Sequence, residues 1–200
     1  DAGQEFATAA ATSESIREGD TYSGIRVSIP CHLATAKMKL SVDLSVGDPI
    51  WPEPSIVELP ALLDQAPLRI RGYPVSMILA EKVTTAIALG TANTRWRDFV
   101  DITSLARSGP HRGETLRRSL ETVSAFRHVE LAPLAHELQG LGKAGQTKWA
   151  TWRNKQNLQG ATPAALDELL GLVAGFIDPI LNSPSPTCTW DPTAWTWTED

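Results

Sequence analysis

The sequence has few of the residues that build disulfide frameworks or metal clusters. Its two cysteines, Cys31 and Cys188, lie far apart in the chain, and two are too few for a disulfide framework or a cysteine-rich metal site. The four histidines have no metal-ligand spacing: His32, His111, His128 and His136. This residue usage favours a protein of the reducing cytoplasm.

Several other signals are also missing. No stretch approaches the roughly 18 apolar residues of a membrane span, and residues 1–5 have neither the basic nor the apolar region of a signal peptide. There is no glycine-rich phosphate loop and no nucleophile elbow. We therefore expect no membrane partner. The first residue is Asp1 and not methionine, so we expect the chain to begin inside a longer one.

The composition is that of an ordinary globular protein. In 200 residues, 42% are hydrophobic and 20% are charged, and the net charge is −5. This length suffices for one good core, or for a small sheet domain plus a helical one. The acidic balance argues against a surface coated in basic charge, although it leaves room for a local basic face.

Strand-like patterns fill the first third of the chain. Residues 25–29 and 38–46 alternate apolar and polar side chains, which predicts half-buried strands that pair as antiparallel neighbours. We expect residues 1–20 to form a loop or an edge segment, and the proline-rich residues 50–66 to form an irregular connection. A short strand is expected at 68–71.

Helical periodicity begins after residue 72. Breaks at glycine and proline divide the following sequence into predicted helices at 75–89, 95–107, 112–126, 131–140, 145–157 and 163–182. We therefore divide the chain into a sheet portion, 1–72, and a helical portion, 73–200. The tail from Ser183 is predicted to be irregular, but its three tryptophans are costly to leave in water and should pack on the body.

Lys82 is the most informative single residue. On a helical wheel it falls within an apolar stripe that includes Ile78, Leu79 and Val83. One interpretation is a lysine at the rim whose stem covers core surface. The other is an ammonium at the edge of the core that binds phosphate. The wheel does not decide between them.

Three aspartates are further candidates. Asp43 lies on the polar face of the second strand, where it could be a magnesium ligand or general base, or an ordinary surface carboxylate paired with a neighbour. Asp98 and Asp101 share one helix face. They could be acidic residues that suit the first turns of a helix, or groups that orient Lys82 or a metal.

Basic residues concentrate in two regions of the helical portion. The first contains Arg117 and Arg118; the second, between Gly140 and Gly160, contains no acid. Basic side chains beside Trp149 and Trp152 could hold an RNA backbone and stack a base, or could form one solvated face over buried tryptophans. The candidate RNA-binding residues are Arg117, Arg118, Lys148, Arg153 and Lys155.

An ordered series of motifs resembles the AbiEii nucleotidyltransferase toxins, which are similar to mycobacterial tRNA-modifying toxins. The series comprises Tyr22–Val27, Lys39–Asp48, Leu59–Leu63, Tyr73–Lys82 and Arg97–Asp101. The resemblance implies an α/β fold, with a partial polymerase-β-type nucleotidyltransferase core built on a mixed sheet and a C-terminal helical domain after it. It also implies transfer of a nucleotide from an NTP with Mg²⁺ to an RNA acceptor, the tRNA 3′ end, and a cognate antitoxin as partner.

The same resemblance assigns roles to residues of this chain. It makes Asp43, Lys82 and Asp101 catalytic, with Asp43 as a metal ligand, and Lys82 and Asp98 nucleotide-binding. The family's first motif, a glycine turn followed by Asp-x-Asp, has no match before Tyr22. Either that motif lies on a portion outside this sequence, or the chain is a non-catalytic relative that binds nucleotide, RNA or protein.

Overall fold

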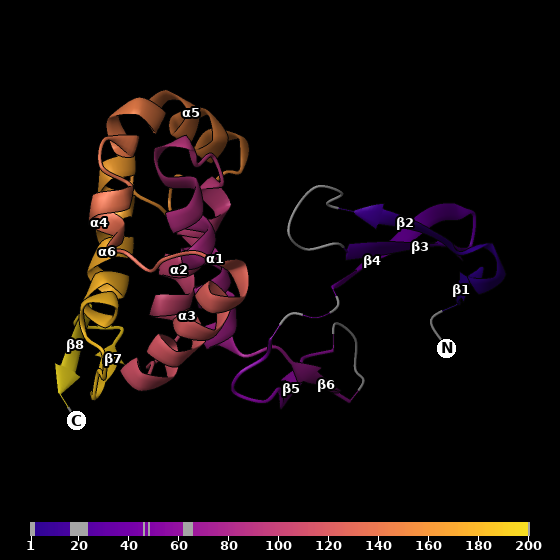
Figure 1. Ribbon diagram of the computed structural model, residues 1–200. Coiled ribbons are helices and arrows are strands. Elements are labelled where there is room, and N and C mark those ends of the chain that lie inside the picture. Colours follow the sequence, from indigo (N-terminus) through magenta and orange to yellow (C-terminus); the bar gives the residue numbers. More distant parts are fainter. Residues whose placement is uncertain (1–2, 17–23, 46, 48, 62–65, 200) are drawn as a thin grey trace. The chain divides into compact units, whose positions relative to one another are not determined.

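The structure is a computed structural model that describes residues 3–16, 24–45, 47, 49–61 and 66–199. The chain divides into two compact units, residues 1–48 and 49–200, and each is described separately (Figure 1). The fold is mixed α/β, as expected, with small sheets and a bundle of helices. The described strand pairs are all antiparallel, which corrects the mixed sheet that was predicted.

The first unit is an antiparallel sheet organised around one long strand. β3 (Gly24–Leu33) pairs along its whole length with β4 (Ala36–Ser45). Its other edge pairs with β1 (Gln4–Phe6) and β2 (Thr12–Ile16), which are joined by the short helix η1 (Thr8–Ala10). The expected antiparallel pairing of the two alternating segments is confirmed, and so is the edge position of the N-terminal segment.

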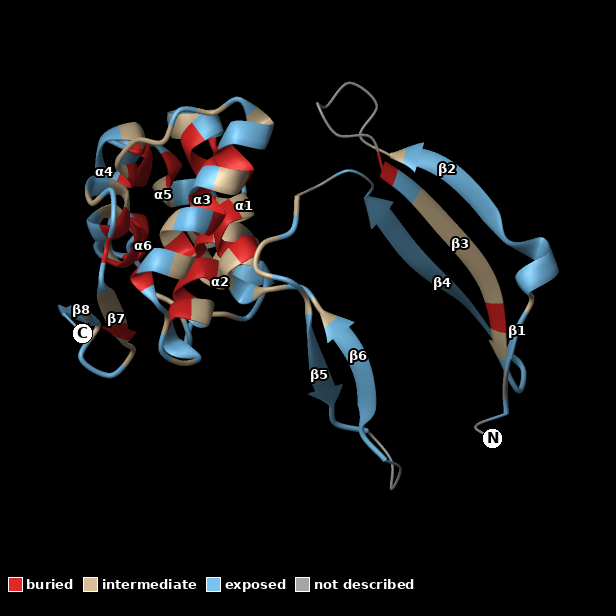
Figure 2. Cartoon of the chain, turned by 60° about the horizontal axis from the view of Figure 1, so that its bottom comes forward, coloured by how far each residue is buried: buried red, intermediate tan, exposed pale blue. Residues whose placement is uncertain are grey.

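The expected half-burial is wrong for β4, whereas residues 26–30 of β3 are half-buried. The register places Ile25, Val27 and Ile29 opposite Leu44, Val42 and Leu40, so one face of the sheet is apolar. Leu40 and Leu44 are nevertheless 41% and 47% exposed, and every residue of β4 is exposed (Figure 2). A sheet buries one face only when a second layer packs on it, and no helix or strand described in this unit does so.

The second unit begins with a hairpin of β5 (Ser55–Leu59) and β6 (Leu68–Gly72). β6 confirms the expected short strand. The irregular connection predicted for residues 50–66 is wrong where β5 lies. The β-branched pair Ile56 and Val57, between Pro54 and Pro60, favours an extended chain there. Strands give way to helices between Gly72 and Val75, where the hydrophobic pattern changes period.

Six helices form the body of the second unit. They are α1 (Val75–Leu89), α2 (Trp96–Arg107), α3 (Gly113–Arg127), α4 (Leu134–Glu137), α5 (Leu141–Lys155) and α6 (Leu166–Asn182), with a short η2 (Gly90–Ala92) after α1. α1 packs on α3, while α6 contacts α2, α4 and α5. Their inward faces form one core that includes Phe99, Trp149 and Phe176, all fully buried (Figures 1 and 2).

The prediction that no stretch is long and apolar enough for a membrane span is wrong for the segment that begins with α1. Residues Val75–Ala92 have a mean hydropathy of 1.3 and are long enough, by length and composition alone, to cross a membrane. In the structure Met77, Leu79 and Val83 of this helix are fully buried in the helical core. The apolar residues of α1 therefore form part of the core of this unit.

The C-terminal tail is a hairpin and not the irregular segment predicted from its prolines. β7 (Cys188–Asp191) pairs with β8 (Thr196–Glu199). The predicted packing of its tryptophans is confirmed, since Trp190 is 1% exposed and its indole N–H donates to the carbonyl of Ala106. Trp197 stacks on Phe176 with ring centroids 5.5 Å apart and donates to that residue's carbonyl. These bonds anchor the tail on α2 and α6.

Candidate functional site

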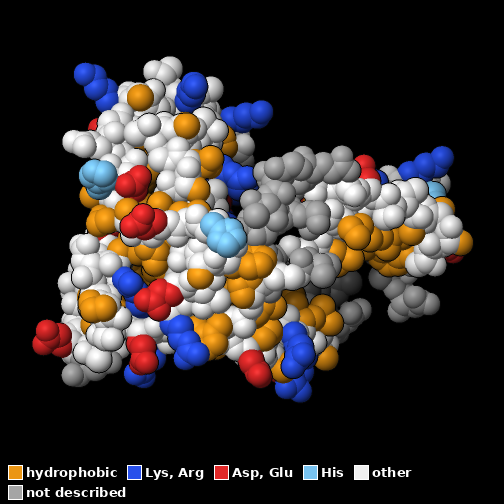
Figure 3. Space-filling view, in the orientation of Figure 1, with side chains coloured by type: hydrophobic (Ala, Val, Ile, Leu, Met, Phe, Trp, Pro, Cys, Tyr) orange, Lys and Arg blue, Asp and Glu red, His pale blue; other side chains and the backbone are white. Residues whose placement is uncertain are grey.

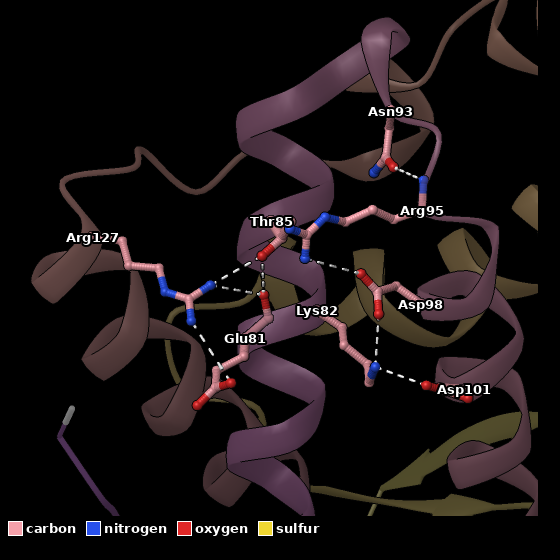
Figure 4. Close-up of polar contacts among 8 residues, drawn as sticks. All are labelled: Glu81, Lys82, Thr85, Asn93, Arg95, Asp98, Asp101 and Arg127. Atoms are coloured by element: carbon pink, nitrogen blue, oxygen red, sulfur yellow. Dashed lines mark hydrogen bonds and ion pairs between the residues drawn. The ribbon is translucent and has the colours of Figure 1, made fainter. Parts of the chain in front are cut away.

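Lys82 of α1 lies between two carboxylates of α2. Its Nζ donates to Asp98 Oδ1 at 2.7 Å and to Asp101 Oδ2 at 2.8 Å (Figure 4). The structure therefore brings together three of the four residues predicted for catalysis or nucleotide binding. We call this group the Lys82 cluster.

Helix geometry explains how the three residues meet. Asp98 and Asp101 are three residues apart, so both carboxylates leave α2 on the same side. The connection from α1 to α2 is short, and the side chain of Asn93 accepts a 2.7 Å bond from the backbone N–H of Arg95 at the start of α2. This turn brings the face of α2 that carries the aspartates toward α1.

Lys82 lies at the edge of the buried face of α1 and not at its centre. The buried residues of this helix include Leu79, Val83 and Thr84, whereas Val75 and Leu89 are 41% and 40% exposed. The apolar stripe predicted from the helical wheel also includes Val75 and Leu89, so it is rotated away from the core face that the structure shows. The Lys82 side chain keeps 19% of its surface exposed, so its stem covers the core and its ammonium group reaches the rim.

The carboxylates keep Lys82 charged. Burial alone lowers the pKa of the ammonium group, but the hydrogen bonds to Asp101 and Asp98 outweigh it and raise the pKa above its ordinary value of 10.5. An ammonium group has three N–H donors, and the two aspartates take two of them. The third can donate to an anion at the rim.

A second polar group surrounds Glu81, next to Lys82 on α1. Tyr73 donates to the Glu81 carboxylate at 2.6 Å, and Arg127 of α3 lies 3.7 Å from that carboxylate. Arg127 also donates to the hydroxyl of Thr85 and to the carbonyl of Glu81 (Figure 4). These residues were not predicted from the sequence to have a role. The signal was the polar Glu81-Lys82 pair within an apolar helix, of which only the lysine was singled out.

Asp43 lies in the first unit and has a partner of its own. Arg26, opposite it on β3, donates to both carboxylate oxygens at 2.7 and 2.9 Å. These bonds raise the pKa of Arg26 above its already high ordinary value. The geometry is that of the surface carboxylate paired with a neighbour, one of the two alternatives for this residue. Its metal role stays a prediction.

The candidate RNA-binding residues fall into two groups. Arg117 bonds Glu121 and the carbonyls of Ile180 and Leu181 at the end of α6. Arg153 bonds the carbonyls of Gln159 and Thr162 after α5. Both guanidinium groups therefore hold the fold together.

The other three candidates differ from those two arginines. Arg118 lies over the Trp51 ring, 4.3 Å from its centroid. Lys148 and Lys155 are exposed on α5. RNA binding by all five residues stays a prediction, and Arg118, Lys148 and Lys155 are the candidates that are exposed.

The residues that the structure describes do not fit a magnesium site by themselves. No group of three His, Cys, Asp or Glu side chains among them could hold a metal ion. In the Lys82 cluster one oxygen of each aspartate bonds the ammonium group, and both oxygens of Asp43 bond Arg26. Mg²⁺ prefers six oxygen ligands, and these aspartates do not supply such a set.

Comparison with protein families identifies a match over most of the chain. The family model for the nucleotidyl transferase AbiEii toxin of type IV toxin–antitoxin systems matches residues 1–171. No curated protein and no solved structure matches the chain. The matched residues include the whole first unit and, in the second unit, the Lys82 cluster, the Glu81 group and α5.

Proposed function

Because the chain belongs to the AbiEii family of nucleotidyl transferase toxins, we propose that it transfers a nucleotide from an NTP to an RNA acceptor, the 3′ end of tRNA. The proposal includes the polymerase-β-type core and the C-terminal helical domain that the resemblance implied. It also includes a cytoplasmic protein held in check by a cognate antitoxin.

The observation that supports it is the Lys82 cluster. A triphosphate carries several negative charges, and transfer of a nucleotide needs fixed positive charge beside it. Lys82 is a fixed positive charge, because two bonds of 2.7 and 2.8 Å orient its Nζ before any ligand arrives. Its third N–H would donate to a phosphate oxygen, while Asp98 and Asp101 hold the ammonium group in place and keep it protonated.

Asp98 and Asp101 would play unequal parts. Asp98 is 15% exposed and Asp101 is 39% exposed. Asp98 also lies 4.0 Å from the guanidinium of Arg95, so it links two cations and is the positioning residue of the cluster. Asp101 faces solvent more fully and would lie closer to an incoming nucleotide.

Transfer of label tests the proposal directly. The full chain is incubated with Mg²⁺, bulk tRNA and each of the four NTPs labelled at the α-phosphate. We expect one or more NTPs to label tRNA, with label lost in Lys82→Ala and kept in Lys39→Ala, an exposed lysine of the first unit. Chelation of the metal should abolish transfer. The proposal fails if no RNA or protein acceptor is labelled.

A binding module is the second candidate, and a specific observation favours it. The described residues contain no three-ligand metal site, and in each predicted metal or catalytic aspartate at least one oxygen bonds a cation of the chain itself. Titration calorimetry with an NTP and Mg²⁺ separates the two. Heat of binding without transfer supports the module; transfer supports the enzyme.

A further inference from the structure

The exposed face of α5 combines positive charge with an absence of acid. Lys143, Lys148 and Lys155 are all exposed, and residues 140–160 contain no Asp or Glu although the chain as a whole carries a net charge of −5. Basic side chains project from the end of the helical unit formed by α5 (Figures 1 and 3). We call this the α5 face.

The spacing of these lysines suits a linear polyanion. Lys148 and Lys155 are seven residues apart, so they lie on the same side of the helix. At about 1.5 Å per residue they are about 10 Å apart along its axis. The exposed residues between and beside them are small or polar: Ala144, Thr147, Thr151 and Asn154. Trp152, four residues after Lys148 and on the same side of the helix, is half-buried. A face whose exposed side chains are small, polar or charged is suited neither to insertion in a membrane interface nor to a dry protein interface.

The two tryptophans of α5 pack within the helical unit. Trp149 is fully buried, and its indole N–H donates to the carbonyl of Pro163. Trp152 is half-buried and stacks on Trp149, with ring centroids 5.6 Å apart. The guanidinium of Arg153 is occupied by backbone carbonyls. Single-stranded RNA sites use base stacking and forked recognition of bases. On α5 the Trp152 ring already stacks on Trp149 and the fork of Arg153 is already bonded, so both are engaged within the fold.

We infer that the α5 face binds the phosphate backbone of double-helical RNA without reading its sequence. Duplex RNA hides its base faces and presents phosphates and ribose hydroxyls, so it is recognised by shape and charge. Exposed lysines with threonine and asparagine between them supply donors for both groups. The inference rests on the proposed function, whose RNA acceptor this face would hold at its double-helical stem.

A matched pair of charge-reversal variants tests the inference. The test variant is Lys148→Glu/Lys155→Glu. The control is Lys37→Glu/Lys39→Glu, which makes the same change in net charge on two exposed lysines of β4. Binding of a labelled RNA duplex and of a single strand of equal length is measured by fluorescence anisotropy over a range of salt concentrations. Circular dichroism checks that both variants keep their helix content.

We expect the wild-type chain and the control to prefer the duplex. The test variant should bind duplex about 50-fold more weakly at about 0.1 M salt, with a salt slope lower by about 2, because each lost phosphate contact removes about 0.9 from that slope. Unchanged binding by the test variant overturns the inference. So does equal loss in the control, a preference for the single strand, or equally tight binding to vesicles of anionic lipid.

The inference and the proposed function can fail separately. Lys82→Ala should lose label transfer but bind duplex like the wild type. Lys148→Glu/Lys155→Glu should bind NTP like the wild type but lose duplex binding. A protein that transfers no label yet shows the expected duplex binding refutes the proposed function alone. A protein that transfers label while the α5 variant binds duplex normally refutes the inference alone.

Discussion

The two units of this chain use apolar residues in different ways. In the helical unit, the inward faces of α1, α2, α3, α5 and α6 meet in one core, and residues such as Phe99, Val173 and Phe176 have no exposed surface. In the described part of the first unit, Cys31 is the one buried hydrophobic residue. The apolar stripe of each helix packs against the other helices. The alternating pattern of a strand predicts the strand itself, but it does not predict a second layer that would cover the apolar face of the sheet.

The charged clusters of the two units also differ in exposure, and the cluster in the helical unit is the more buried one. Arg26 and Asp43 of the sheet are 40% and 44% exposed, although two short hydrogen bonds join them. Lys82 and Asp98 of the helical unit are 19% and 15% exposed. Water screens the first pair more than the second. Similar chemistry therefore contributes differently to stability in the two units.

The largest expected difference is in packing. Phe176→Ala in the helical core should lower the free energy of unfolding by about 3 to 5 kcal/mol, because it leaves a cavity beside Trp190 and Trp197. Leu40→Ala on the exposed face of β4 should cost less than about 1 kcal/mol. Urea unfolding followed by circular dichroism measures the first, and hydrogen exchange over residues 24–45 measures the second. Equal losses would show that the apolar face of the sheet is covered in solution.

A smaller difference is expected between the two charged clusters. Asp98→Asn should lower the free energy of unfolding by about 1 to 3 kcal/mol, because it leaves Lys82 partly buried with one carboxylate instead of two. Asp43→Asn should leave the unfolding midpoint unchanged within error, because its pair with Arg26 is exposed. Urea titration of both variants provides the comparison. If Asp43→Asn lowered the free energy of unfolding more than Asp98→Asn, the exposed pair would be the more stabilising of the two, contrary to this prediction.

The smallest expected effect depends on pH. The pKa of Lys82 is raised in the folded state, so its stabilising contribution is fully present below the unfolded value of about 10.5. That contribution is lost as pH rises through the higher folded pKa. The difference in unfolding free energy between wild type and Lys82→Met should be constant from about pH 8 to 10 and should shrink above that range. A difference that does not change with pH would mean that the charge of Lys82 does not contribute to stability.

Much of the helical unit could be predicted from the sequence. The bounds of α1 match the prediction, and α2 and α3 each begin one residue later than predicted, because glycine and proline break the apolar periodicity at their ends. β5 and the β7–β8 hairpin were missed, because short strands between prolines have no long-range periodicity and are fixed by pairing. The half-burial expected for β4 failed because a single strand carries no information on what packs against it.

The site was predictable in its residues but not in its contacts. The position of Lys82 in an apolar helix and the spacing of Asp98 and Asp101 identified the cluster, while only the structure shows that both aspartates bond the lysine. Arg117 and Arg153 looked like Lys148 in composition. They differ because their guanidinium groups reach backbone carbonyls that are 63 and 9 residues away in sequence, respectively, and no local pattern encodes such a contact.

The tryptophans are distributed unevenly between the units. All seven, from Trp51 to Trp197, fall within residues 49–200, and Trp190 lies within 5.3 Å of the rings of both Trp195 and Trp197. Intrinsic tryptophan emission therefore reports on the helical unit and carries no direct signal from the sheet. A thermal melt followed by emission would monitor the unfolding of one unit only. A tryptophan placed on β3 or β4 would supply the missing optical probe.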